Sequence, residues 1–188
     1  MRNDLWISLA ALLVFAVSSL PVSAQSANPK VLIKTSMGDI TLELDQAKAP
    51  VTVKNFLSYV QDKFYDGTIF HRVMPGFMIQ GGGLTADMHE KAAKPPIKNE
   101  SGNGLKNARG SVAMARTNEL NSATSQFYIN HVDNFGLDDA KYCVFGKVID
   151  GMNVVDAIAK VKTGVRGVHS DVPREPITIL SVTRLESK

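Results

Sequence analysis

One arginine, Arg72, lies within the segment FHRVMPGFMIQGGG at residues 70–83, where most of its neighbours are apolar or aromatic. The segment holds no serine, cysteine or carboxylate that could serve as a nucleophile beside the arginine. An arginine side chain is a permanent cation with several N–H donors. The pattern therefore favours a reaction that uses a fixed donor in apolar surroundings and forms no covalent intermediate.

Other catalytic and ligand-binding motifs are missing from the sequence. There is no G-x-S-x-G elbow to supply a serine nucleophile. Gly81-Gly82-Gly83 lacks the Lys-Ser/Thr of a phosphate-binding loop and is interpreted as a bulge or the start of a loop. The histidines are far apart without metal-ligand spacing, so we expect structural or surface roles and no metal site. They are His71, His89, His131 and His169.

The N-terminal residues have the order of a secretory signal. Arg2 is followed by an apolar run at residues 5–17 and by the small residues Val22-Ser23-Ala24. A membrane-spanning helix needs about 20 apolar residues, whereas residues 5–20 number only 16 and include three serines. We therefore expect a signal peptide at residues 1–24, cleaved after Ala24, and no stable membrane insertion afterwards. A retained anchor is the alternative.

Charge and cysteine content limit the remaining classes of protein. The formal net charge is +3 and no three basic residues are consecutive, whereas nucleic-acid binding normally needs a clustered basic patch. We expect no nucleic-acid partner. Cys143 is the single cysteine and lies in an apolar run, which predicts a buried small hydrophobe and no internal disulfide. The 164 residues after the leader (188 minus 24) are enough to form a hydrophobic core.

Short strands dominate the rest of the chain. Residues 31–33 and 40–44 flank a turn at residues 36–39 and predict a hairpin with one buried face. Further strands are expected at residues 68–73, 77–80, 111–115, 126–130, 142–148 and 177–185.

Two helices and one long connection complete the pattern. Pro50 begins an amphipathic segment in which Val53, Phe56, Leu57 and Val60 share one face, and a second helix follows Gly151. Residues 84–109 show no sustained period, and a connection of this length is often functional. The pattern predicts one domain, either a closed β barrel or a sandwich, and leaves that choice open.

Four sequence blocks follow one another along the chain and carry a family resemblance: residues 70–83, Met114-Ala115-Arg116, SQFYIN at residues 125–130 and VFGKVIDG at residues 144–151. In these blocks, and across residues 31–185, the chain resembles the cyclophilin family of peptidyl-prolyl cis/trans isomerases. With its leader it is similar to exported, periplasmic bacterial members. The resemblance implies a mainly β fold, a closed eight-stranded antiparallel barrel capped by two α-helices, with the peptide groove outside the barrel.

The resemblance also implies a role for each matched residue. Arg72 matches the catalytic arginine, and no cofactor is expected. The proline pocket is matched by Phe77, Met78, Tyr128 and Leu137. Positions that hold the substrate backbone or support the arginine are matched by Gln80, Ala115, Arg116 and Gln126, with Arg116 acting through its main chain. Tyr142 stands where many relatives have histidine and keeps an aromatic or hydrogen-bonding wall.

Strand geometry agrees with this assignment. Gln126 and Tyr128 are two residues apart and share one face of a strand, as do Met78 and Gln80. Burying these glutamines and Arg72 in a core would be costly unless they were paired. A groove with apolar walls and a few polar groups explains them better.

Proline isomerisation would suit a site without a nucleophile. Rotation about an amide bond has a barrier of about 18–20 kcal/mol, and a catalyst must bind the twisted amide better than the planar forms. Arg72 would donate to the prolyl nitrogen, which becomes an acceptor on twisting, while Gln80 holds the guanidinium. We expect proline-containing exported polypeptides as folding clients and a monomer. The alternative is a proline-peptide binding module or chaperone on the same scaffold.

Two positions depart from the family pattern. Many relatives have a tryptophan where this chain has Gly136, and here Phe135 is one residue away. Because that tryptophan contributes to cyclosporin binding in the family, we expect cyclosporin to bind only weakly. Tyr128 stands where phenylalanine is common, and its hydroxyl either narrows the proline pocket or bonds to a neighbour.

Overall fold

The N-terminal hairpin forms as the alternating pattern predicts. The computed structural model describes residues 28–186, so the expected signal peptide and its cleavage site lie outside the described residues. β1 (Lys30–Thr35) and β2 (Gly38–Leu44) pair antiparallel around a tight turn. Ile40, Leu42 and Leu44 are buried, which places one face of the hairpin in the core.

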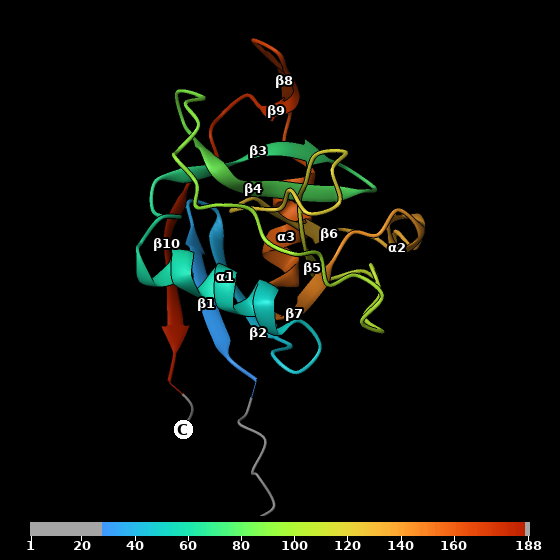
Figure 1. The fold of residues 1–188 in the computed structure, drawn as a ribbon. Helices are drawn as coiled ribbons and strands as arrows, with labels where there is room; N and C mark the ends of the chain where they lie inside the picture. The colour runs from blue at the N-terminus through green and yellow to red at the C-terminus, as the bar shows by residue number, and fades with distance from the viewer. Residues whose placement is uncertain (1–27, 187–188) are drawn as a thin grey trace, which may run out of the picture.

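Eight of the strands within residues 28–186 join into one curled antiparallel sheet (Figure 1). In pairing order its eight strands are β10 (Ile179–Leu185), β1, β2, β7 (Val144–Asp150), β5 (Ser111–Met114), β6 (Phe127–Asn130), β4 (Met78–Thr85) and β3 (Thr68–Met74). Its outer strands approach each other at a bridge between Ile69 and Thr178, where the Phe70 amide donates to the Ile177 carbonyl at 3.0 Å. The mainly β, barrel-like fold is thereby confirmed, and a sandwich is excluded.

Two helices pack against this sheet as expected. α1 (Pro50–Gln61) begins with proline at its first turn and buries Val53, Phe56 and Val60. Glu100, from the long connection, accepts hydrogen bonds from the amides of Val51 at 3.0 Å and Thr52 at 2.8 Å. A carboxylate at this end satisfies free amides and complements the helix dipole. α3 (Met152–Ala159) buries Val155 and Ile158.

The centre of the curled sheet is filled by aromatic side chains. The ring of Phe56 lies 5.1 Å from that of Tyr65, 5.5 Å from that of Phe127 and 5.3 Å from that of Phe145, measured between centroids. Such tilted and edge-on pairs add to the free energy of burial. Cys143 is buried beside this core, as its apolar context predicts.

Some elements have no counterpart in the sequence prediction. A hairpin of β8 (Thr163–Arg166) and β9 (His169–Pro173) stands above β3 in Figure 1, and α2 (Gly136–Asp139) is a single short turn. The expected strands at residues 126–130 and 142–148 begin later, at Phe127 and Val144. Gly81 to Gly83 lie inside β4, which pairs with β3 through shifts in register, so they form a bulge rather than the start of a loop.

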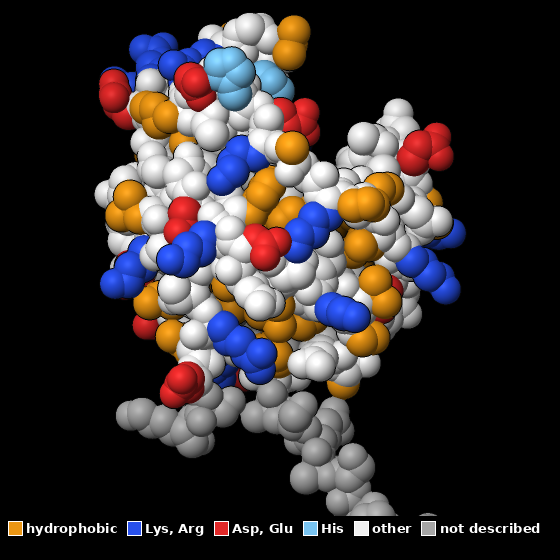
Figure 2. Space-filling model, turned by 60° about the vertical axis from the view of Figure 1, so that its left-hand side comes forward, with side chains coloured by type: hydrophobic (Ala, Val, Ile, Leu, Met, Phe, Trp, Pro, Cys, Tyr) orange, Lys and Arg blue, Asp and Glu red, His pale blue; other side chains and the backbone are white. Residues whose placement is uncertain are grey.

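The surface mixes charges of both signs. Figure 2 shows lysine and arginine side chains spread over the viewed face, with aspartate and glutamate side chains between them. Hydrophobic side chains are visible between these charges on the same face. None of the helices within residues 28–186 is both long and apolar enough to cross a membrane.

Candidate active site

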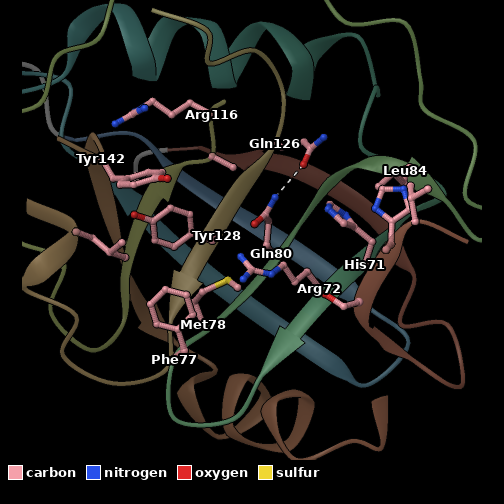
Figure 3. A pocket seen from close by; sticks show the side chains of 15 residues that line it. His71, Arg72, Phe77, Met78, Gln80, Leu84, Arg116, Gln126, Tyr128 and Tyr142 are labelled. Atoms are coloured by element: carbon pink, nitrogen blue, oxygen red, sulfur yellow. Dashed lines mark hydrogen bonds between the residues drawn. The ribbon is translucent and has the colours of Figure 1, made fainter. Parts of the chain in front are cut away.

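A pocket of about 440 Å³ opens on the outer face of the sheet, where β3, β4 and β6 lie side by side (Figure 3). All ten residues that the sequence predicts for the site line it: Arg72, Phe77, Met78, Gln80, Ala115, Arg116, Gln126, Tyr128, Leu137 and Tyr142. Five further residues complete the lining: His71, Leu84, Val168, His169 and Ser170.

The register of the strands brings the central residues together. Arg72 on β3 is opposite Gln80 on β4, and Gln80 is opposite Tyr128 on β6. Directly paired residues in an antiparallel sheet have their side chains about 5 Å apart on one face. The three side chains therefore form a row across three neighbouring strands, on the face opposite the aromatic core.

The bulge in β4 gives Gln126 its place. A Cβ atom added at Gly83 would lie 2.5 Å from Cγ of Gln126, and one at Gly81 would lie 2.7 Å from the carbonyl oxygen of Ile69. Neither position leaves room for a larger residue without displacing its neighbour. Nε2 of Gln80 donates to Oε1 of Gln126 at 2.9 Å (Figure 3), which links the row to the segment before β6.

Arg72 is held by a residue that the sequence did not indicate. The side-chain amide of Gln80 donates to Gln126. The ion-pair partner of Arg72 among the described residues is Asp171 on β9. The Asp171 carboxylate lies 4.0 Å from Nε of Arg72, whose side chain is 41% exposed. Gln80 therefore lies beside the guanidinium, but the opposing charge comes from the β8–β9 hairpin.

The apolar wall of the pocket is a hydrophobic cluster separate from the barrel core. Met78 and Tyr128 are buried within it, and Phe77 and Leu137 pack against it from the rim. This arrangement brings together all four residues matched to the proline pocket. The wall can exclude water from an apolar ring placed against it.

The hydroxyl of Tyr128 bonds to a neighbour, which resolves the two alternatives left open by the sequence. It donates to Oδ1 of Asn107 at 2.8 Å, and Nδ2 of Asn107 donates to Oδ1 of Asp138 at 2.8 Å. Burial raises the pKa of Tyr128 well above its ordinary value, so the hydroxyl remains a neutral donor. Asn107 comes from the connection between β4 and β5 and ties Tyr128 to α2, which carries Leu137.

The side chain of Arg116 has a structural function beside the pocket. Its guanidinium lies 4.5 Å from the centre of the Tyr142 ring and donates to the carbonyl of Thr117 at 2.7 Å. The Tyr142 ring in turn meets that of Tyr128 edge-on, with 6.0 Å between centroids. A cation over an aromatic face is attracted by the ring quadrupole. Tyr142 thus forms an aromatic part of the pocket lining.

His71 is buried beside Arg72, and burial lowers its pKa to about 4. The nearby ring of His169, with 6.3 Å between the ring centroids, acts in the same direction. His71 is therefore neutral at neutral pH and adds no second positive charge next to the arginine. Within residues 28–186, no group of three or more histidine, cysteine, aspartate or glutamate side chains has an arrangement that could hold a metal ion.

Position 136 leaves the rim of the pocket open. A Cβ atom added at Gly136 would have no heavy atom within 4 Å. Phe135, one residue earlier, is 53% exposed and does not line the pocket. Phe135 therefore does not take the place of the tryptophan that many family members have here.

Comparisons with known proteins agree with this geometry. The family model for cyclophilin type peptidyl-prolyl cis-trans isomerase/CLD matches residues 30–184. A peptidyl-prolyl cis-trans isomerase of Acinetobacter baylyi is 56% identical over 171 residues, which cover 88% of this chain and 91% of the relative. Peptidyl-prolyl cis-trans isomerase B of Escherichia coli is 55% identical over 160 residues, which cover 81% of this chain and 98% of the relative.

Solved structures give the same result. A cyclophilin type peptidyl-prolyl cis-trans isomerase of Cryptosporidium parvum superposes with a TM-score of 0.73 at 28% identity, covering 86% of this chain and 99% of the other. A structure of that protein in the presence of the dipeptide Ala-Pro gives a TM-score of 0.71, and the match covers 84% of this chain and 99% of the other. The chain belongs to the cyclophilin family and is a peptidyl-prolyl cis-trans isomerase.

Proposed function

We propose that the pocket around Arg72 catalyses rotation about X–Pro bonds by binding the twisted amide more tightly than either planar isomer. The observation that carries this proposal is the row of Arg72, Gln80 and Tyr128 across three strands, with the apolar wall beside it. The wall, which includes the Tyr128 ring, would hold the proline ring, and Arg72 would present its donors to the rotating amide.

Each step of the proposed reaction uses a group in the pocket. The proline ring packs against Phe77, Met78 and Leu137 while the rest of the peptide remains in the groove. As the C–N bond twists, resonance is lost and the prolyl nitrogen regains a lone pair. Asp171 lies on the Nε side of Arg72, which leaves the two Nη groups to donate to that nitrogen. No bond to the enzyme forms, and no proton is transferred.

The polar groups around Arg72 would position the substrate and would transfer no proton. Gln80 and Gln126 are joined by a hydrogen bond at 2.9 Å, so their remaining donor and acceptor sites have fixed directions. These sites would hold the substrate backbone while the amide turns. A donor that is already in place needs no reorganisation as the transition state forms, which makes its contribution to the rate larger.

The test is an isomerase assay on a proline test peptide with wild-type protein and Arg72→Ala. We expect kcat/KM to fall by about a hundredfold or more, the loss typical when one transition-state donor is removed. Arg184→Ala, an exposed arginine on β10, is the matched control and should retain wild-type activity. Unchanged activity in Arg72→Ala would overturn the role proposed for this arginine. A proline-binding chaperone would instead bind the peptide without raising its exchange rate.

We further propose that the substrates are proline-containing segments of exported proteins and that the protein acts in the periplasm. The order of residues in the N-terminal 24 positions supports export. Gln25 found as the first residue of protein recovered from its native host would support it, and an intact N-terminus would contradict it. We also propose weak cyclosporin binding, because Gly136 leaves the rim of the pocket open.

A further inference from the structure

The β8–β9 hairpin is attached to the catalytic strand and to the loop after β4. The His169 ring meets that of His71 edge-on, and the Asp171 carboxylate faces Nε of Arg72 at 4.0 Å. Nη1 of Arg166 donates to the carbonyl of Ala86 at 2.9 Å. These contacts hold the hairpin against β3, on the side of Arg72 away from the apolar wall that Tyr128 and Leu137 form.

The tip of this hairpin exposes two valines that have no packing function there. Val168 follows the left-handed turn residue Gly167 and is 96% exposed, and Val165 is 76% exposed. Val168 also lines the catalytic pocket, whereas Val165 does not. The exposed apolar surface of Val168 is thus continuous with the pocket that binds the proline, and this continuity indicates what covers it.

We propose that the β8–β9 hairpin forms a second wall of the peptide groove, and that Val168 contacts an apolar side chain flanking the proline. This inference rests on the proposed function. An extended peptide advances about 3.3 Å per residue, so a chain that leaves the apolar wall and passes Arg72 reaches the hairpin within a few residues. There it meets Val168, His169 and Ser170.

The chemistry of this wall determines which substrates it favours. A leucine or phenylalanine side chain laid on Val168 removes apolar surface of both partners from water, whereas glycine at the same position removes almost none. The bound segment is therefore a polypeptide with a bulky apolar residue close to the proline. Its contact with Val168 adds to binding without taking part in the bond rotation.

The test uses one set of proline peptides that differ only in the flanking residues. Leucine and glycine are compared at the position immediately before the X–Pro pair and at the position immediately after it. At one of these positions we expect wild-type kcat/KM to be about fivefold higher with leucine, from partial burial of both side chains. Val168→Ser should reduce this ratio to about one. Val165→Ser, on the same hairpin but outside the pocket, is the matched control and should leave the ratio unchanged.

A binding measurement separates contact from indirect effects. The methyl resonances of Val168 should shift when the leucine peptide is added, and those of Val165 should not. Equal kcat/KM for leucine and glycine peptides at every position would overturn this inference and leave the proposed function standing. The same drop in the leucine-to-glycine ratio in both valine variants would do so too. If the wild-type protein isomerised none of the peptides, the proposed function would fail and this inference with it.

Discussion

The two faces of the same strands have different composition and different functions. Ile79 and Phe127 point into the barrel and pack in a core of aliphatic and aromatic side chains. Met78 and Tyr128 are their neighbours in sequence, and they belong to the smaller cluster at the pocket. Because side chains alternate along a strand, one short segment supplies both the core and the site.

The difference shows how a candidate active site can be built on the outside of a packed, curled sheet. The inner face gains its stability from apolar burial and from close packing of rings. The outer face combines apolar walls with Gln80 and Arg72, which remain only partly covered. Polar groups are tolerated there because each can find a partner in the protein or in solvent. Stability and function are therefore separable by substitutions at adjacent positions.

The largest expected effect is on the inner face. Phe127→Ala should lower the free energy of unfolding by about 3–5 kcal/mol, because it opens a cavity among the aromatic rings of the core. Urea unfolding followed by circular dichroism measures this change. An unfolding midpoint close to the wild-type value would contradict the assignment of Phe127 to the core.

The buried histidine beside Arg72 should make stability depend on pH. The pKa of His71 is about 4 in the folded protein, below the ordinary value of 6.5 that applies when it is unfolded. Between these values the unfolded chain binds a proton that the folded chain does not, so stability falls as the pH drops from 6.5 towards 4. The loss should reach about 3 kcal/mol at the lower end, from 1.36 kcal/mol per pKa unit.

Thermal or urea unfolding across this pH range provides the measurement. His71→Gln removes the titrating group and should flatten the dependence. Equal slopes in the wild type and in His71→Gln would show that His71 is not the group responsible.

The open rim at position 136 gives the next effect. Gly136 has free space around it, in contrast to Gly83, where an added Cβ atom would collide with Gln126. We therefore expect Gly136→Trp to fold normally and to raise cyclosporin affinity by about tenfold, or about 1.4 kcal/mol. Inhibition of isomerase activity by cyclosporin measures this change. Strong inhibition of the wild type would already contradict the prediction.

The hydroxyl at the pocket wall should have a smaller effect. Tyr128→Phe removes a donor from Asn107, but Nδ2 of Asn130 still donates to the same oxygen at 3.1 Å. We expect a loss of about 0.5–1.5 kcal/mol in unfolding free energy. We also expect kcat/KM within about threefold of wild type, because the ring keeps its place against Tyr142. A much larger loss of activity would mean that the hydroxyl acts on the substrate.

The sequence predicts the strands and the residues within the motifs well, because both depend on local pattern. The alternation of Ile40, Leu42 and Leu44 indicates the first hairpin directly, and Pro50 marks the start of α1. Gln80 and Gln126 are predicted for the site by the family resemblance, and strand periodicity agrees because it puts each on the same face as a pocket residue. The structure places both at the pocket.

The missed residues depend on contacts between distant segments. Asp171 and His169 lie about a hundred residues after Arg72, and only the docking of the β8–β9 hairpin on β3 brings them together. Asn107 comes from a connection without periodicity, whose length was the only sign of a function. His71 had a local signal, its place next to Arg72, but its burial follows from tertiary packing.

The smallest expected effect concerns the ion pair between the two regions, Arg72 on β3 and Asp171 on the hairpin. Both side chains are more than a third exposed, and their closest charged atoms are 4.0 Å apart, so solvent and salt weaken the attraction. Asp171→Asn should lower kcat/KM by about two- to threefold through a less fixed guanidinium, with little change in the unfolding midpoint. The difference in kcat/KM between wild type and Asp171→Asn should be smaller in about 1 M salt, where the Debye length is about 3 Å. Asp87→Asn, an exposed carboxylate that faces His89, is the control. A deficit that persists unchanged at high salt would show that Asp171 acts through packing of the hairpin rather than through its charge.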